Sequence, residues 1–286
     1  MLTILITFLF LYLIGMVIYA SAKSFSSNFP FYEARIIGII DSLTGNLENL
    51  LGNSIDMNLD NIDWFNTIQN FSITKSMLSG IGSFFSFLWN IILVTIFVVY
   101  LLIGKTNLYS KIYRAFSTEK SKTVIKIIDN ITSQSQMYLN TKSFVSLITA
   151  VLSLIIFKIF GLDFAIIWAF LIFVFNFIPN FGSFVASILP ITIALIQFDS
   201  ILNVLWMGIL ILGIQFGMGN IIEPKLMGRS LNLSPLMVIL SLIFWGWIWG
   251  IAGMLLAVPI LGTITIIFEN IESLKFISVF LRGDKK

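Results

Sequence analysis

The sequence contains no cysteine and no histidine among its 286 residues. Without cysteine there are no disulfides, no thiolate nucleophiles and no cysteine-ligated metals. Without histidine the chain lacks the most frequent general base, proton relay and metal ligand. Zinc proteases and Ser-His-Asp hydrolases are therefore excluded. Carboxylates, amides, hydroxyls and the backbone remain, and these groups suffice for binding and transport. We expect no enzyme activity, no cofactor and no metal.

Charged residues are also scarce. They make up 11% of the chain, apolar residues make up 58%, and the mean hydropathy is +0.99. Soluble domains carry about 25% charged residues, so 17 basic and 14 acidic residues cannot cover a water-soluble surface of this size. The net charge of +3 is too small to indicate nucleic-acid binding. The composition predicts an all-α, polytopic integral membrane protein.

The first predicted region, residues 1–104, has two membrane helices around a polar segment. Residues 2–20 and 84–104 are uncharged apolar runs long enough to span a bilayer. A signal peptide is the competing interpretation of residues 2–20, but it requires a basic segment that does not precede them. Residues 24–83 hold two basic and six acidic residues, with apolar positions at helical spacing. They predict an external, acidic, amphipathic region.

The second region, residues 105–142, is basic, with seven basic and two acidic residues. We expect an amphipathic helix that lies on anionic lipid at the cytoplasmic face. Basic loops stay in the cytoplasm, so both chain termini are predicted to be cytoplasmic.

The third region, residues 143–286, is almost continuously apolar and is the predicted transport core. Residues 143–160 and 200–219 are apolar enough to span, and a polar loop is expected over 220–235. Shorter apolar segments predict re-entrant hairpins at about 164–198 and 236–258, since roughly 20 helical residues are needed to cross. A helix plus a hairpin, repeated in inverted sense, is typical of secondary transporters.

The tip of the first hairpin is a candidate substrate site. Proline and glycine free backbone groups there, and free groups at membrane depth must face protein or a water-filled cavity. The alternative is an ordinary interfacial loop. The candidate residues are Asn176, Pro179, Asn180, Gly182 and Ser183.

A second candidate site follows the next long span. Gln215 and Asn220 are candidate substrate ligands, and Gln215, Gly219 and Glu223 step by four along one helix face. Glu223 is expected to pair with Lys225 or Arg229. That pair has either a structural or an ion-coupling role, and the alternative is an exposed salt bridge worth roughly 0–1 kcal/mol. The structural or ion-coupling set is Glu223, Pro224, Gly228 and Arg229.

Several motifs resemble the autoinducer-2 exporter family of transporters. They are residues 178–183 (IPNFGS), 220–229 (NIIEPKLMGR), 233–236 (LSPL), 241–246 (SLIFWG) and 253–259 (GMLLAVP). The resemblance covers roughly residues 1–280 and implies a helical, oligomeric inner-membrane transporter. A pentameric assembly would be compatible with the family. Family members usually have two further N-terminal helices, so residue 1 is expected to correspond to the start of the family's third helix.

The leading hypothesis is a secondary transporter, an exporter of a small polar organic solute similar to autoinducer-2. One alternative is a sodium/proton-type antiporter that uses Glu223, and another is a non-transporting membrane scaffold. The sequence has no ATP-binding loop, so pumping would draw on ion or solute gradients. Expected partners are membrane lipid, a small polar solute or ion, and further copies of the chain, with no nucleic acid.

Overall fold

The computed structural model describes residues 15–16, 24, 27–28, 30–32, 34–39, 94, 97–98, 100, 108–179, 181–227 and 232–283. The chain divides into two compact units, Met1–Ile103 and Gly104–Lys286, and each is considered by itself. In the first unit the described residues are helical. Most of the predicted spans 2–20 and 84–104, and most of the acidic segment 24–83, lie outside the described residues.

The second unit is built from helices, which confirms the predicted all-α class. No strand occurs among its described residues, where the only extended pairing is an isolated bridge between Leu233 and Arg282. In chain order the helices are α4 (Leu108–Ala115), α5 (Thr118–Phe160), α6 (Ala165–Phe175), α7 (Phe181–Gln197), α8 (Ile201–Phe216), η3 (Gly217–Ile222), α9 (Glu223–Met227), α10 (Pro235–Trp249), α11 (Ile251–Glu269), η4 (Glu272–Leu274) and α12 (Lys275–Leu281).

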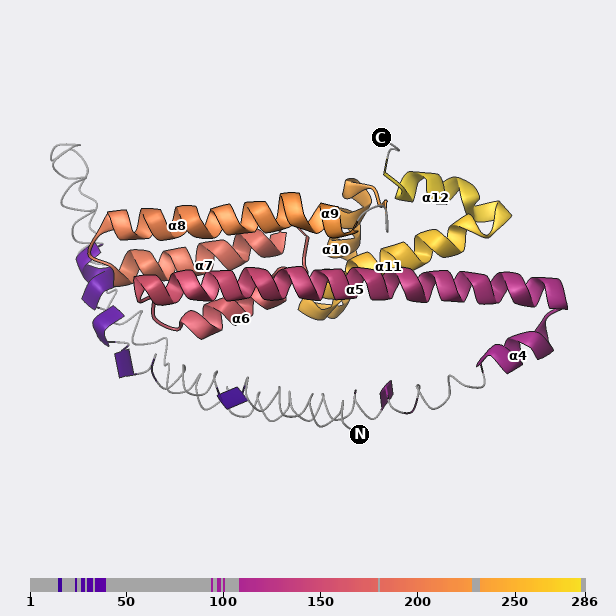
Figure 1. Ribbon diagram of the computed structural model, residues 1–286, viewed down its shortest axis with the longest axis horizontal. Helices are drawn as coiled ribbons and strands as arrows, with labels where there is room; N and C mark the ends of the chain where they lie inside the picture. The colour runs from indigo at the N-terminus through magenta and orange to yellow at the C-terminus, as the bar shows by residue number, and fades with distance from the viewer. Residues whose placement is uncertain are drawn as a thin grey trace, which may run out of the picture. The chain divides into compact units, whose positions relative to one another are not determined.

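Helix α5 runs without interruption for 43 residues (Figure 1). No proline or glycine occurs between Thr118 and Phe160, so nothing in the sequence ends the helix until Gly161, which caps it in the left-handed conformation with φ 70°. At 1.5 Å per residue the helix is about 65 Å long, twice the roughly 30 Å hydrocarbon core. The helix passes through residue 142, at which the predicted basic segment ends and the predicted transport core begins.

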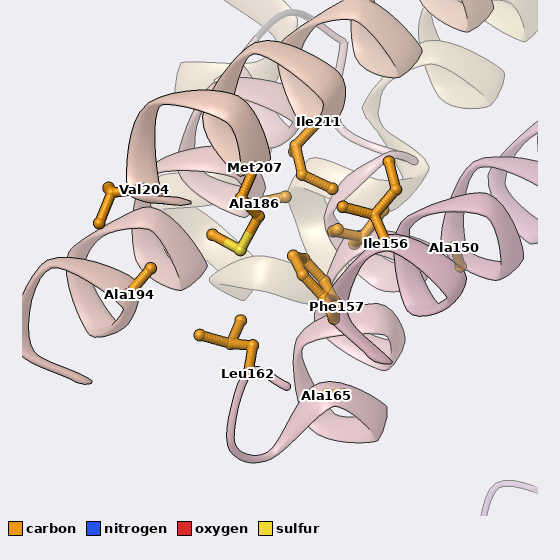
Figure 2. Packing of buried hydrophobic residues seen from close by; sticks show 11 residues of the cluster. Ala150, Ile156, Phe157, Leu162, Ala165, Ala186, Ala194, Val204, Met207 and Ile211 are labelled. Atoms are coloured by element: carbon orange, nitrogen blue, oxygen red, sulfur yellow. The ribbon is translucent and has the colours of Figure 1, made fainter. Parts of the chain in front are cut away.

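Helices α5 to α8 form a four-membered group around one apolar core. Helix α5 contacts α6 and α8, and α7 contacts the same two helices from the other side. Phe157, Met207 and Ile211 are fully buried and point toward one another, with Ala186 of α7 beside them (Figure 2). Van der Waals packing of these side chains holds the helices together, since lipid tails are as apolar as the core and give no hydrophobic driving force.

Helix lengths separate spanning from short elements. Among the described residues, three continuous helices are long and apolar enough to cross a membrane, namely Thr118–Phe160, Ile201–Met227 and Ile251–Glu269. Helices α6, α7 and α10 are apolar but have only 11, 17 and 15 residues. They measure about 17, 26 and 23 Å.

The two predicted hairpins correspond to the helix pairs α6–α7 and α10–α11. The first pair closely matches the predicted range 164–198. The second differs, because residue 258 lies in the middle of α11, which continues to Glu269. Pro259 follows within the helix. A proline there removes one hydrogen bond and crowds one carbonyl, which this helix accommodates without ending.

The bend of each pair depends on a glycine that packs against a backbone carbonyl. A Cβ added at Gly182 would lie 1.7 Å from the carbonyl oxygen of Phe175, and one added at Gly253 would lie 1.9 Å from that of Trp245. Any side chain would overlap these oxygens. The two helix pairs therefore share the same glycine–carbonyl packing, in which the glycine lies in the first turn of the second helix.

The bend of the first pair packs against the second pair. Ile178 is buried with Leu242 of α10 and Ala257 of α11. Within the second pair, the Ser241 hydroxyl donates a hydrogen bond of 3.0 Å to the Ala257 carbonyl. The first bend is therefore enclosed by protein on this side.

Candidate functional site

The bend between α6 and α7 contains most of the first predicted site. Asn176 ends α6 and is buried, with its backbone N–H bonded to the Ile172 carbonyl at 3.0 Å. Its side-chain amide makes no hydrogen bond to any described residue. Pro179 lies in the turn, while Gly182 and Ser183 already belong to the first turn of α7. The predicted residue Asn180 lies outside the described residues.

The second predicted site lies on a helix that is longer than expected. The expected polar loop from residue 220 is helical as far as Met227, because α8 continues through the π-helix η3 into α9. Pro224 explains the wider turn. It has no N–H to donate to the Asn220 carbonyl, and its ring would crowd that carbonyl in a regular α-helix. Single π turns inside α-helices occur frequently at functional sites.

The π turn also determines which residues share a face. Two α-helical turns take 7.2 residues, and the wider π turn takes more residues than an α-helical turn. Gln215 and Glu223, which are eight residues apart, therefore both lie on the side facing α5. Gln215 is buried and Glu223 contacts α5, whereas Gly219 and Asn220 are exposed. Asn220 therefore does not join Gln215. Pro224 is exposed, and Gly228 and Arg229 lie outside the described residues.

Glu223 is paired with a residue from a distant part of the chain. Its Oε1 lies 2.5 Å from Nζ of Lys142 on α5, and the two side chains are only 17% and 5% exposed. Within the described residues the expected pairing with Lys225 is not found; Lys225 is exposed. A buried charge left without its partner is costly, so each member of this pair requires the other.

Sequence analysis placed Lys142 in the basic stretch and missed the polar face to which it belongs. Tyr138, Lys142, Ser146, Thr149 and Ser153 are all buried on α5. Their spacing of four, four, three and four residues is that of one helix face. That spacing, continued from the basic half into an apolar run, was the signal available in the sequence.

The model of the AI-2E family transporter matches residues 1–273. The chain belongs to the AI-2E transporter family. This membership confirms the resemblance found in the sequence and the predicted class of membrane transport protein rather than enzyme.

Three relatives of this AI-2E family chain illustrate the match. A protein of Borreliella burgdorferi is 39% identical over 196 residues, which is 68% of this chain and 54% of that protein. One of Haemophilus influenzae is 32% identical over 94% of this chain and 77% of its own length. Both are named "Putative transport protein". The AI-2 transport protein TqsA of Escherichia coli K12 is 31% identical over 88% of this chain and 71% of TqsA. The chain thus spans about half of the first relative and about three quarters of the other two.

The site of this AI-2E family chain contains hydrogen-bonding groups and one ion pair that carries no net charge. Amides come from Asn176 and Gln215, and hydroxyls come from the buried face of α5. The single carboxylate, that of Glu223, is already paired with Lys142. This set of groups suits the reversible binding of a polar molecule.

Proposed function

We propose that this AI-2E family chain is a secondary transporter that exports a small polar organic solute, similar to autoinducer-2, across the inner membrane. The observation that carries the proposal is the group of buried amides and hydroxyls beside interrupted helices, in an otherwise apolar molecule. Interrupted helices at membrane depth are typical of transporter binding sites. The name of the relative TqsA supports the choice of solute.

The proposal includes an orientation and an assembly state. Basic residues in 105–142 and in the tail support cytoplasmic termini. Family resemblance supports a homo-oligomer. Membrane lipid is the surrounding solvent in this proposal, and the basic segment is its point of contact with anionic headgroups.

Transport in proteoliposomes tests the function directly. We expect a panel of small neutral hydroxylated solutes to show protein-dependent movement that saturates with solute concentration. Measurements with and without sodium and proton gradients identify the coupling. Ion exchange without solute movement would support the antiporter alternative, and the absence of both would support the scaffold.

We further propose that α6–α7 and α10–α11 enter the membrane as re-entrant hairpins from opposite faces. Helices α6 and α10 are too short to cross about 30 Å of hydrocarbon. The glycine–carbonyl packing found at both bends supports a repeated unit.

Single-cysteine labelling tests this topology in a chain that has no native cysteine. We expect Asn180→Cys to react with an impermeant maleimide only from outside, and Trp247→Cys only from inside. Both reactions should be slow, because the sites lie at depth. Rapid labelling of Asn180→Cys from the cytoplasm is the result for an ordinary loop and would exclude the first hairpin.

A further inference from the structure

Three buried polar atoms where α5 packs against α8 have no hydrogen-bond partner among the described residues. Each belongs to a side chain that is at least nine-tenths buried. Buried polar groups are paired in the great majority of cases, so a cluster of unpaired ones requires an explanation. The atoms are Ser146 Oγ, Ser153 Oγ and Gln215 Nε2. Tyr138 Oη is also unpaired within the described part of the chain, but Tyr138 lies on the other side of the Lys142–Glu223 pair.

Ser146, Ser153 and Gln215 lie at one level of the contact between α5 and α8. Helices α5 and α8 touch and run in opposite directions (Figure 1). From the Lys142–Glu223 pair, eight residues forward along α5 reach Ala150, and eight residues back along α8 reach Gln215. Equal rise per residue therefore puts Gln215 level with Ala150, between Ser146 and Ser153.

The chemistry of this face defines the ligand. Hydroxyls both donate and accept hydrogen bonds, and the amide nitrogen donates. A bare cation would need a carboxylate, but Glu223 is already neutralised by Lys142. A charged ligand would also have to lose its hydration without compensation. The face therefore suits an uncharged molecule with several hydroxyl groups.

We propose that the α5–α8 polar face, defined as Ser146, Ser153 and Gln215, binds a small neutral hydroxylated solute beside the Lys142–Glu223 pair. This inference rests on the proposed transport function and gives it a location and a ligand class. The bound solute supplies the hydrogen bonds that the three polar atoms lack.

The proposal predicts opposite effects on stability and on binding. Removing a polar group that has no partner costs the folded state nothing and can stabilise it. Ser146→Ala, Ser153→Ala and Gln215→Leu should therefore unfold at or above the temperature of the unmodified protein. Each should bind solute about fivefold more weakly, the equivalent of one hydrogen bond.

Equilibrium dialysis of the full chain in lipid nanodiscs provides the measurement, with erythritol, D-ribose and methyl β-D-ribofuranoside as probes. Tryptophan fluorescence reports unfolding in the same samples. Two matched controls remove similar groups elsewhere. Gln134→Leu removes a half-buried amide of α5 that is bonded to Asn130, and Thr265→Val removes a buried hydroxyl of α11 that is bonded to the Leu261 carbonyl. We expect both controls to bind the probes normally.

Each result decides the proposal. Weaker binding by the three variants, with normal binding by both controls, supports it. Solute transport by the unmodified protein that all three variants retain would overturn the binding site and leave the transport function standing. If no probe binds and none is transported, both the proposed binding site and the proposed transport function are wrong. If Gln215→Leu does not fold, the two serine variants, which each remove only a hydroxyl, still decide. Destabilisation of both Ser146→Ala and Ser153→Ala would show structural hydroxyls and overturn the proposal.

Discussion

Lys142→Met should destabilise the protein by about 3 kcal/mol, because it leaves the Glu223 carboxylate without its partner. Methionine retains the unbranched apolar stem of lysine, so the change isolates the loss of charge. The free energy of unfolding by denaturant in detergent micelles is the measurement. Glu223→Met removes the other member and should have a similar effect, since Lys142 is the more deeply buried of the two.

The double variant separates an ion pair from two independent effects. With Lys142→Met and Glu223→Met combined, no charge is left unpaired, and the stability should return to within about 1 kcal/mol of the unmodified protein. Lys225→Met, beside Glu223 but exposed, is the matched control and should change little. Equal losses from Lys142→Met and Lys225→Met, or additive losses in the double variant, would contradict the pairing.

The importance of Glu223 was readable from the sequence, but its partner was not. Glu223 follows an uncharged run and precedes a proline, which marks it as unusual. Lys142 is 81 residues away, and only the antiparallel packing of α5 against α8–α9 brings the two together. Sequence analysis favours partners within one or two turns, since local geometry is known in advance whereas a register between distant helices is not.

The boundaries of the transport core show the same limit. Composition and apolar runs predicted an all-α membrane protein, and short segments predicted the α6–α7 pair with its proline and glycine bend. The change from basic to apolar composition at residue 142 does not end α5, because composition alone breaks no backbone hydrogen bond. The polar loop expected from residue 220 begins as a helix, because a π turn accommodates Pro224 and α9 continues to Met227.

The glycines at the two bends give the second large expected effect. Gly182→Ala and Gly253→Ala should each cost about 3 kcal/mol or more, because the added Cβ would lie 1.7 or 1.9 Å from a backbone oxygen. A carbonyl cannot swing aside as a flexible side chain can, so the helices of each pair must separate. Folded yield and unfolding temperature in detergent measure the result.

Two other glycines complete a graded series. At Gly246 an added Cβ would lie 2.7 Å from Cε of Met254, the flexible end of a side chain that can move at smaller cost. At Gly213 the added Cβ meets nothing within 4 Å, and alanine there should stabilise α8 by up to about 1 kcal/mol through helix propensity. The expected order, from most to least stable, is Gly213→Ala, then Gly246→Ala, then Gly182→Ala and Gly253→Ala together.

If Gly182→Ala were as stable as Gly213→Ala, the bend would not pack closely against the Phe175 carbonyl. If the stabilities of Gly182→Ala and Gly253→Ala differed widely, the two helix pairs would not share the same glycine–carbonyl packing, and the proposed repeat would lose its structural support.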